Sequence, residues 1–285
     1  MKNKIVLITG ANRGIGKETT RALARKGATI VMACRNLEKA ESVGEMIQRE
    51  SKNPNIQAMK LDLASLQSVR NFTREFKARY EKLDVLINNA GVFSMKREET
   101  EEGFELTMGV NHLGHFLLTH ELLPLLEKTA EARIINLSSN AHYSADLDLE
   151  DLHFKRRKYS GIKAYGASRL ATVFFTQELA ERLKGKDITV NALHPGHVDT
   201  SMWDLWGAER KWYQSIINGI IKFFLISAEE GAQTSIYLAS SNEVKGITGK
   251  YFAKKKIKAA SKKCADIKLQ KELWQLSERL TGINK

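Results

Sequence analysis

The sequence predicts an α/β fold in which a doubly wound parallel sheet is covered by helices on both faces. Short runs of β-branched and aliphatic residues alternate with longer amphipathic segments, as they do in βαβ units. A glycine-rich turn, TGANRGIG at 9–16, lies between the first apolar run and the first helical segment. No linker rich in glycine, serine or proline interrupts the 285 residues, which favours a single domain over residues 1–285.

The first half of the chain follows this alternation from its start. KIVLIT at 4–9 is a short apolar β-type run, and Asn36 is a plausible N-cap for an amphipathic helix. The expected elements are a strand at 4–9, a helix near 14–26, a strand at 28–34, a helix at 36–50, a strand at 56–62, a helix at 65–80, a strand starting in 83–91 and one long helix over about 103–127.

The second half continues the same pattern and places a tyrosine on its longest helix. The expected elements are a strand at 132–139, a helix at about 163–183, a strand at 188–196, a helix at 228–239, a short strand at 250–252 and a terminal helix at about 266–280. In open α/β sheets the ligand binds at the carboxyl ends of the strands. We therefore expect functional residues directly after each strand.

The composition of the chain limits the kinds of function that it can have. Cys34 and Cys264 are far apart in the chain, which fits a reducing compartment and indicates neither a disulfide framework nor a metal cluster. No apolar stretch is long enough for a signal peptide or a membrane span, so we expect a soluble, cytoplasmic protein. The net charge of +12 attracts polyanions, but the basic cluster at 254–263 lacks interleaved aromatic residues, and we expect no nucleic-acid partner.

The glycine-rich turn indicates dinucleotide binding. Gly10, Gly14 and Gly16 let the backbone turn tightly and approach a pyrophosphate at the positive end of the next helix. A NAD-specific site needs an acidic residue about 20 positions further on. The sequence has Arg35 there and Arg13 in the turn, and two guanidinium groups are suited to a 2′-phosphate. We therefore expect NADP(H), the alternative being two surface arginines.

Polar residues follow the remaining strands. Asp62 either accepts a hydrogen bond from an adenine amino group or helps to cap the next helix. Asn88 and Asn89 are expected to tie neighbouring strand ends together. Ala90 and Gly91 leave room for a cofactor, Ser138 and Ser139 are candidate donors to an oxyanion or carbonyl, Pro195 and Gly196 turn the chain, and Thr200 can reach the far end of the cofactor.

These motifs together resemble the short-chain dehydrogenase/reductases, which have a Rossmann-type fold. TGANRGIG, NNAG (88–91), the strand-end serines, Tyr165 and HPG (194–196) match that family in order and spacing from residue 3 to about 252. A finer resemblance, to the retinol dehydrogenase subgroup, rests on ACRN (33–36), NHLGHFLLT (111–119), EEGAQTSIYLA (229–239), GKYF (249–252) and LWQLSERLTGI (273–283).

The resemblance implies an oxidoreductase with defined residue roles. Tyr165 would be the general acid for carbonyl reduction and the base for the reverse reaction, Ser139 would bond the substrate oxygen, and Asn111 would hold a water in a proton relay. The implied cofactor-binding residues are Gly10, Asn12, Arg13, Gly14, Ile15, Gly16, Arg35, Asp62, Leu63, Asn89, Ala90, Gly91, Tyr165, Arg169, Pro195, Gly196, Val198 and Thr200.

Arg169 departs from the family pattern, which has a lysine four residues after the tyrosine. On a helix this spacing puts both side chains on one face, where the cation favours the phenolate. A guanidinium supplies charge and hydrogen bonds but does not readily release a proton. Three interpretations stay open: an active reductase with a modified relay, a weakened enzyme, and a silent NADP(H)-binding protein.

The segment over about 200–227 covers the substrate in that family. Here it is aromatic, which predicts a hydrophobic carbonyl or alcohol as the substrate. The rings are Trp203, Trp206, Trp212, Tyr213, Phe223 and Phe224. Alternatives are that these rings only pack on the core, or that the segment contacts a membrane interface beside Lys211 and Lys222. A monomer and a homodimer are both compatible with the resemblance.

Overall fold

The computed structural model describes residues 1–196 and 227–283. The aromatic segment expected to cover the substrate, together with Val198 and Thr200, lies outside the described residues except for Ser227.

One sheet organises the described part of the chain, and its strand order is β3-β2-β1-β4-β5-β6-β7-β8. The strands are β1 (Ile5–Thr9), β2 (Thr29–Cys34), β3 (Ile56–Lys60), β4 (Val85–Asn88), β5 (Ala132–Leu137), β6 (Ile188–His194), β7 (Tyr251–Ala253) and β8 (Lys256–Lys258). Neighbours from β3 to β7 pair in parallel, and β8 is antiparallel to β7. The prediction of a doubly wound α/β fold is confirmed.

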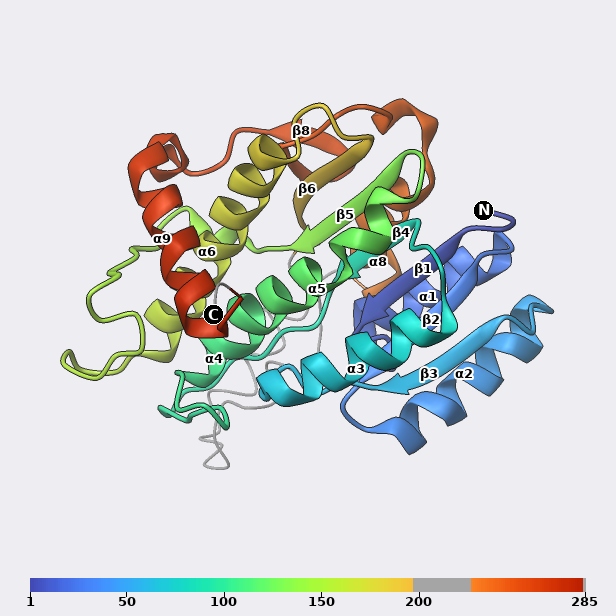
Figure 1. The fold of residues 1–285 in the computed structure, drawn as a ribbon, viewed down its shortest axis with the longest axis horizontal. Helices are drawn as coiled ribbons and strands as arrows, with labels where there is room; N and C mark the ends of the chain where they lie inside the picture. Colours follow the sequence, from blue (N-terminus) through green and yellow to red (C-terminus); the bar gives the residue numbers. More distant parts are fainter. Residues whose placement is uncertain (197–226, 284–285) are drawn as a thin grey trace, which may run out of the picture.

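Helices cover both faces of this sheet (Figure 1). They are α1 (Gly14–Arg25), α2 (Leu37–Ser51), α3 (Leu66–Arg79), α4 (Leu106–Met108), α5 (His115–Glu127), α6 (Gly161–Arg182), α8 (Ala228–Ser240) and α9 (Ile267–Thr281). One core cluster joins α3, α5 and part of α6 to the sheet, and a second joins α1, α2 and α8 to the opposite face. The strands β1, β2, β4, β5 and β6 are therefore buried on both sides, which explains their continuous apolar runs.

Helix α6 lies deeper than its neighbours. Sixteen of its residues are buried, because the sheet covers one side and α9 the other. Trp274 of α9 stacks on Phe175 of α6 at 5.9 Å between ring centroids, and Phe116 of α5 meets the same indole edge-on at 5.0 Å. These aromatic contacts fix α6 between two helices, so that residues at its start have defined positions over the sheet.

The long helix expected over about 103–127 is present from Leu106 to Glu127, but it is not α-helical throughout. A π-helical segment, Gly109–Gly114, lies between α4 and α5. Two glycines bound this segment: a Cβ at Gly109 would collide with Thr100, and a Cβ at Gly114 would lie 2.6 Å from the Leu63 carbonyl oxygen. Close packing against loops that are distant in sequence decides this geometry, and the hydrophobic periodicity carries no signal for it.

Strand β8 was not predicted. Its three residues, Lys256–Lys258, are all exposed, and they form an edge strand within the basic cluster at 254–263. Charged edge strands lack the apolar alternation that identifies a strand in sequence. The short apolar strand before it was expected at 250–252 and is observed at Tyr251–Ala253.

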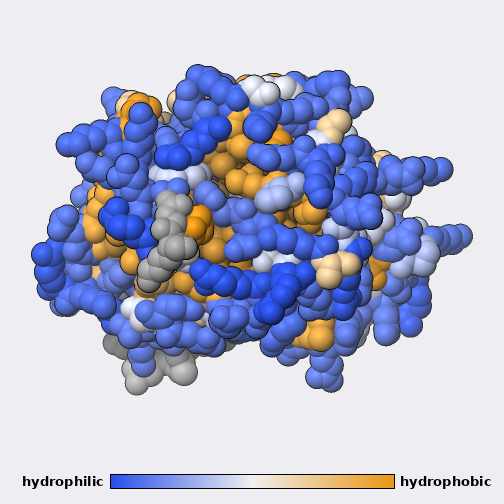
Figure 2. Space-filling model, in the orientation of Figure 1, coloured by the Kyte–Doolittle hydropathy of each residue, from blue (hydrophilic) through white to orange (hydrophobic). Residues whose placement is uncertain are grey.

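The face of the molecule shown in Figure 2 is mostly hydrophilic, with apolar residues visible in a hollow near its centre. In the described residues, no helix combines the length and apolar character that crossing a bilayer requires.

Buried histidines make the stability of the fold depend on pH. Burial lowers the pKa of His112 to about 3 and of His115 to about 4, against an ordinary value near 6.5. The neutral imidazole is therefore required in the folded state. The stabilisation is complete above about pH 6.5 and is lost as the pH falls toward 4.

We predict that the free energy of unfolding in urea falls between about pH 7 and pH 5, by on the order of 2 kcal/mol for each such histidine. His112→Gln, which keeps a polar atom for the Ser277 hydroxyl, should reduce this pH dependence. Lys271→Gln, at an exposed position on α9, is the matched control and should leave it unchanged. If His112→Gln and the wild type had equal pH dependence, the loss of stability could not be assigned to protonation of His112.

Candidate active site

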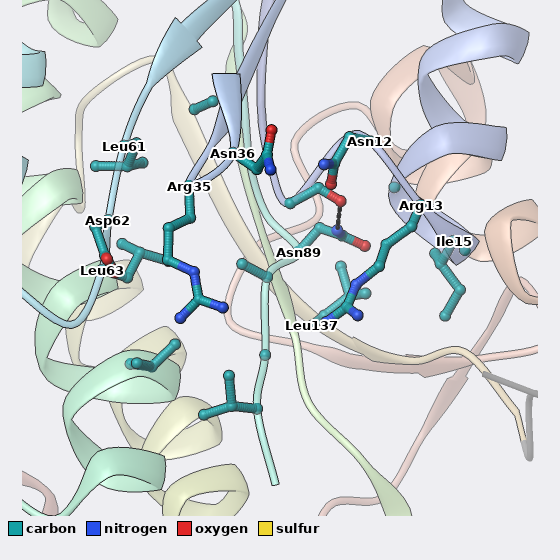
Figure 3. A pocket seen from close by; sticks show the side chains of 18 of the residues that line it. Asn12, Arg13, Ile15, Arg35, Asn36, Leu61, Asp62, Leu63, Asn89 and Leu137 are labelled. Carbon is teal, nitrogen blue, oxygen red and sulfur yellow. Dashed lines mark hydrogen bonds between the residues drawn. The ribbon is translucent and has the colours of Figure 1, made fainter. Parts of the chain in front are cut away.

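A cavity of about 570 Å³ lies at the carboxyl ends of the central strands (Figure 3). This volume lies within the range of small-molecule sites. The predicted residues that line it are Gly10, Asn12, Arg13, Gly14, Ile15, Gly16, Arg35, Asp62, Leu63, Asn89, Ala90, Gly91, Tyr165, Arg169 and Pro195. The lining also includes Ala33, Asn36, Lys39, Leu61, Val92, Val110, Leu137 and Ser138. The fold thus brings residues from six strand ends and from α6 into one cavity.

The three glycines after β1 have two different roles. Gly10 and Gly14 have φ angles of 64° and 51°, a region that favours residues without a Cβ. Gly16 is helical, but a Cβ there would collide with the Gly10 carbonyl oxygen and lie 2.6 Å from Asn89 Nδ2. The turn is therefore pressed against the end of β4, and its backbone faces the cavity at the start of α1.

Asparagines join the strand ends, as the sequence indicated. Asn89 Nδ2 donates to the Thr9 carbonyl at 2.7 Å and so connects β4 to β1. Asn88 Nδ2 donates to Asn136 Oδ1 at 2.8 Å and to Thr119 Oγ1 at 3.0 Å, which connects β4 to β5 and to α5. These two amides fix the spacing of the three central strands where the cavity opens.

The cavity carries an excess of positive charge. Among the described residues that line it, the cations are Arg13, Arg35, Lys39 and Arg169, and the one carboxylate is Asp62. Figure 3 shows the guanidinium groups of Arg13 and Arg35 on opposite sides of the cavity. No ion pair is recorded for Arg35 within the described residues, so its charge is available to an anionic ligand. Lys39 was missed, although it lies in the first turn of the helix that follows Arg35.

Asp62 lines the cavity and also shapes the local chain. Its Oδ1 accepts the backbone N–H of Ala64 at 3.0 Å, which forms a tight turn after β3. Ser65 is the N-cap of α3, since its hydroxyl accepts the N–H of Ser68. Ser65, and not Asp62, is therefore the N-cap of α3.

Tyr165 lies in the second turn of α6 and faces the cavity. The phenol ring meets Phe93 edge-on, with centroids 5.6 Å apart. No hydrogen bond to its hydroxyl is recorded from any described residue, so the group is available to a ligand. Ser160 caps α6, and a Cβ at Gly161 would collide with the Ser94 carbonyl oxygen. The start of α6 is thus seated directly on the loop that follows β4.

Arg169 is buried, with 5% of its surface exposed, and no described carboxylate pairs with it. Its Nη1 donates to the Leu137 carbonyl at 2.8 Å, and its guanidinium carbon lies 5.0 Å from the centroid of the Tyr165 ring. Nε is buried, and no described residue forms a hydrogen bond with it. A Cβ at Gly91 would collide with Nη2, so the absence of a side chain there makes room for the guanidinium.

A buried, unpaired cation is unfavourable unless an anion or polar ligand compensates it. Arg169 therefore points to an electronegative group in the cavity beside Tyr165. This observation, the backbone turn at Gly10 and the exposed Arg35 fit the phosphates and ribose of a dinucleotide.

The two strand-end serines differ in their contacts. Ser138 lines the cavity, but its hydroxyl donates to the Arg169 carbonyl at 2.9 Å. Ser139 Oγ accepts the N–H of Ala141 at 3.2 Å, and no acceptor for its proton is recorded among the described residues. Ser139 is therefore the better placed of the two to donate a hydrogen bond, although it lies outside the residues that line the cavity.

The Asn111 side chain is hydrogen-bonded within the protein. Its Oδ1 accepts from Val92 N at 2.8 Å, and its Nδ2 donates to the Val92 carbonyl and to Ser168 Oγ at 3.0 Å each. Both amide protons are therefore used, and a water held by this residue would bond to an oxygen, either Oδ1 or the main-chain carbonyl. Gly196 is described, with a φ of 103°, but does not line the cavity.

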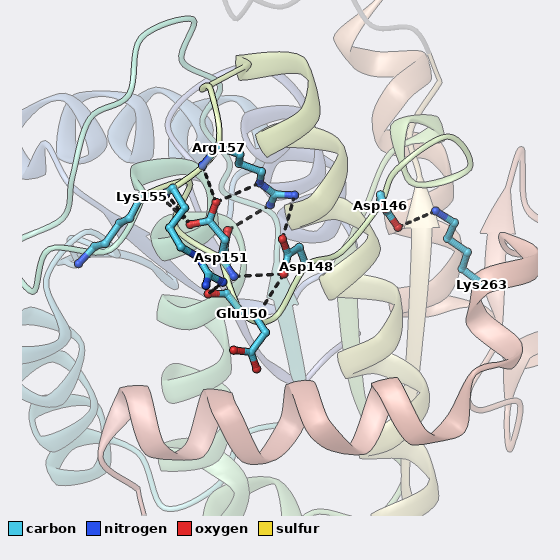
Figure 4. Close-up of polar contacts among 8 residues, drawn as sticks. Asp146, Asp148, Glu150, Asp151, Lys155, Arg157 and Lys263 are labelled. Carbon is cyan, nitrogen blue, oxygen red and sulfur yellow. Dashed lines mark hydrogen bonds and ion pairs between the residues drawn. The ribbon is translucent and has the colours of Figure 1, made fainter.

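The chain between β5 and α6 is held by a carboxylate-centred loop (Figure 4). Asp151 is buried and accepts the backbone N–H groups of Lys155, Arg156 and Arg157 at 2.7, 3.1 and 3.0 Å. Lys263 pairs with Asp146 at 2.9 Å. These contacts restrain the segment that leads to α6 and hence support the position of Tyr165. Within the described residues, no group of three or more His, Cys, Asp or Glu side chains is suited to hold a metal ion.

Comparisons with known proteins agree with this architecture. The family model for short chain dehydrogenase matches residues 4–211. Retinol dehydrogenase 13 of Homo sapiens is 46% identical over 98% of this chain and 85% of its own length. Retinol dehydrogenase 14 of Homo sapiens is 42% identical over 100% of this chain and 88% of its own length.

Two solved structures superpose on most of this chain. An uncharacterized protein from Mycobacterium paratuberculosis superposes with a TM-score of 0.80 at 34% identity, covering 99% of this chain and 94% of that chain. A short chain dehydrogenase from Escherichia coli, solved with NADPH, has a TM-score of 0.70 at 26% identity over 90% of this chain and 98% of that chain.

The contact between Gly16, Gly10 and Asn89 predicts a strict requirement for glycine at position 16. We expect Gly16→Ala to lower the free energy of unfolding by about 1–3 kcal/mol, because the new methyl displaces backbone and the Asn89 amide. Gly44→Ala is the matched control, since a Cβ in α2 meets its nearest neighbour at 3.5 Å. The control should be stabilised by up to about 1 kcal/mol. Equal stability changes in urea unfolding would contradict the packing argument.

Proposed function

Because the chain belongs to the short chain dehydrogenase family, we propose that it transfers a hydride between NADP(H) and the carbonyl or alcohol group of a hydrophobic substrate. The family makes it an oxidoreductase that acts on CH–OH groups with a nicotinamide cofactor. The observation that carries the proposal is the cavity itself, where the Tyr165 phenol and the buried Arg169 cation face the same space as the glycine-rich turn.

The preference for NADP(H) rests on charge. Arg35 lines the cavity directly after β2, where a NAD-specific site has a carboxylate, and Arg13 lines it from the glycine-rich turn. Lys39 adds a third cation from the first turn of α2. Two guanidinium groups and an ammonium stabilise a 2′-phosphate through charge-assisted hydrogen bonds. Asp62 has one oxygen in a local turn, which leaves the second for an adenine amino group.

Tyr165 is the proposed proton donor for carbonyl reduction and the acceptor for alcohol oxidation. A bound nicotinamide supplies or accepts the hydride. The Tyr165 hydroxyl has no recorded partner among the described residues and is therefore free to bond a substrate oxygen. Ser139 would donate a second hydrogen bond to that oxygen, and the two donors would hold it in a defined orientation.

Arg169 is proposed to stabilise the phenolate of Tyr165 electrostatically. Its guanidinium lies on the tyrosine ring and is held by the Leu137 carbonyl, so the charge is fixed without a carboxylate to neutralise it. Because a guanidinium keeps its proton, Arg169 would orient groups but would not transfer protons. Tyr165 and Arg169 would hold the ribose of a bound cofactor, and a water at the Asn111 carbonyl would serve as the proton source.

The proposed apolar substrate is supported by side chains next to Tyr165. Phe93 packs edge-on against the phenol ring. Met95 and Ile162 are 51% and 63% exposed, although both are large hydrophobic residues. They belong to segments in contact with each other, since a Cβ at Gly161 would lie 3.0 Å from the Met95 Cα. Exposed apolar side chains in the segments that carry Phe93 and Tyr165 favour a hydrophobic aldehyde, ketone or alcohol.

Cofactor preference has a direct test. We expect Arg35→Ala to raise the Kd for NADPH by about 10- to 100-fold, the value of one or two charge-assisted hydrogen bonds, and to leave the Kd for NADH nearly unchanged. Arg49→Ala is the matched control, because Arg49 is an exposed arginine of α2 outside the cavity. Calorimetric titration measures both constants. An equal loss of affinity for the two cofactors would contradict recognition of the 2′-phosphate by Arg35.

Turnover tests the roles of Tyr165 and Arg169. NADPH oxidation is followed with a panel of hydrophobic aldehydes and ketones across a range of pH. Tyr165→Phe should lower kcat by about 10²- to 10⁴-fold, since it removes the proton donor and keeps the ring. Arg169→Lys should retain turnover with an altered pH profile, because lysine can release a proton. A silent wild type whose activity is restored by Arg169→Lys would instead support the alternative of an NADP(H)-binding protein without catalysis.

A further inference from the structure

A buried line of polar contacts connects the ends of β1 and β4 to the π-helical segment. His115, at the start of α5, lies between Thr9 and Asn111, and all three residues are at most 4% exposed. Its Nε2 is 2.9 Å from Thr9 Oγ1, and its Nδ1 is 3.2 Å from the Asn111 carbonyl oxygen. The imidazole therefore spans the distance between the two elements.

The partners determine where the proton of the ring lies. A carbonyl oxygen only accepts hydrogen bonds, so Nδ1 carries the proton that is donated to Asn111. Burial, opposed by this hydrogen bond and reinforced by the positive charge of Arg169, lowers the pKa of His115 to about 4, so the ring is neutral at pH 7. Nε2 is then without a proton and accepts from the Thr9 hydroxyl.

This assignment gives the Thr9 hydroxyl the nearer of two acceptors, since His115 Nε2 lies at 2.9 Å and the Ile87 carbonyl at 3.5 Å. The Thr9 hydroxyl donates to His115 Nε2, and the same oxygen accepts the backbone N–H groups of Asn89 and Ala90 at 2.9 Å each. Asn89 and Ala90 line the cavity, so the ring is connected through one hydroxyl to the backbone of the cofactor site. Buried polar groups are favourable only when they are paired in this way.

The Asn111 carbonyl accepts a side-chain hydrogen bond from His115 Nδ1. In a regular α-helix it would accept the N–H of residue 115. Here that N–H donates to the His112 carbonyl, because the π-helical segment displaces the hydrogen-bonding pattern. The side chain of His115 supplies a donor to the Asn111 carbonyl. The Asn111 amide, which is bonded to both backbone groups of Val92, transmits any movement of this residue to the loop after Gly91.

We propose that His115 is a positioning residue that sets the Asn111 carbonyl through Nδ1 and the Thr9, Asn89 and Ala90 junction through Nε2. The proposal rests on the proposed function, because Asn111 is assigned there to the proton relay and the junction to cofactor binding. The two nitrogens consequently have separable effects. Loss of the Nδ1 contact should slow proton delivery to Tyr165, and loss of the Nε2 contact should weaken cofactor binding.

Two amide side chains reproduce the two halves of the imidazole. Asparagine places its Nδ2 near the position of Nδ1, and glutamine places a terminal amide atom near the position of Nε2. We expect His115→Asn to keep kcat within about 3-fold and to raise the Kd for NADPH roughly 10-fold, the value of one buried hydrogen bond. We expect His115→Gln to show the reverse pattern, with kcat lowered roughly 10-fold and Kd nearly unchanged.

Two further variants exclude a merely structural role. His115→Phe should impair both kcat and Kd, whereas a ring that only fills space would be replaced by phenylalanine without either effect. His120→Gln is the matched control on the same helix, because His120 packs on Trp274 and its Nε2 has no recorded partner. It should change neither constant. Thermal unfolding of every variant separates a loss of fold from a loss of positioning.

The outcomes of the experiment are distinct. Identical effects of His115→Asn and His115→Gln on both constants, or unchanged constants in His115→Phe, would overturn the proposal. If the wild type binds NADPH but turns over no carbonyl substrate, the proposed reductase activity fails. In that case, comparing the Kd for NADPH between His115→Asn and His115→Gln still tests whether the Thr9 contact supports cofactor binding, since calorimetric binding requires no turnover.

Discussion

A hydrogen-bonded junction between β1 and β4 determines the geometry of the site. Thr9 Oγ1 accepts two backbone N–H groups from the end of β4, and the Asn89 amide returns a bond to the Thr9 carbonyl. The same amide limits residue 16 to glycine, because a Cβ would lie 2.6 Å from it. Two strand ends and the start of α1 are thus held in one rigid arrangement, which is the condition for a preorganised backbone site.

A second constraint joins α6 to β5. Ser138 donates to the Arg169 carbonyl, and Arg169 donates to the Leu137 carbonyl, at 2.9 and 2.8 Å. This reciprocal pair sets the height of α6 over the sheet and therefore the height of Tyr165, one turn earlier on the same helix. The guanidinium, which replaces the shorter ammonium of the family pattern, is accommodated because Gly91 has no side chain in its path.

Most of the fold and of the cavity could be predicted from sequence because the signals were local. Apolar runs followed by turn residues located β1 to β7, and the doubly wound order placed Gly10, Arg35 and Asn89 at neighbouring strand ends. Other features carried no local signal. The π-helical segment depends on contacts of Gly109 and Gly114 with distant loops, and β8 is an exposed basic edge.

The sequence by itself determined the order of strands and helices, the glycine turn, the basic residues that replace a carboxylate after β2, and the pairing of Tyr165 with an arginine. Tertiary structure alone decided which of these groups are free to act. It occupied the Asn111 amide, the Ser138 hydroxyl and the His115 ring with buried partners, and it left Tyr165 and Ser139 with protons to donate. The physical reason is that hydrogen-bond satisfaction in a buried site depends on contacts between residues far apart in the chain.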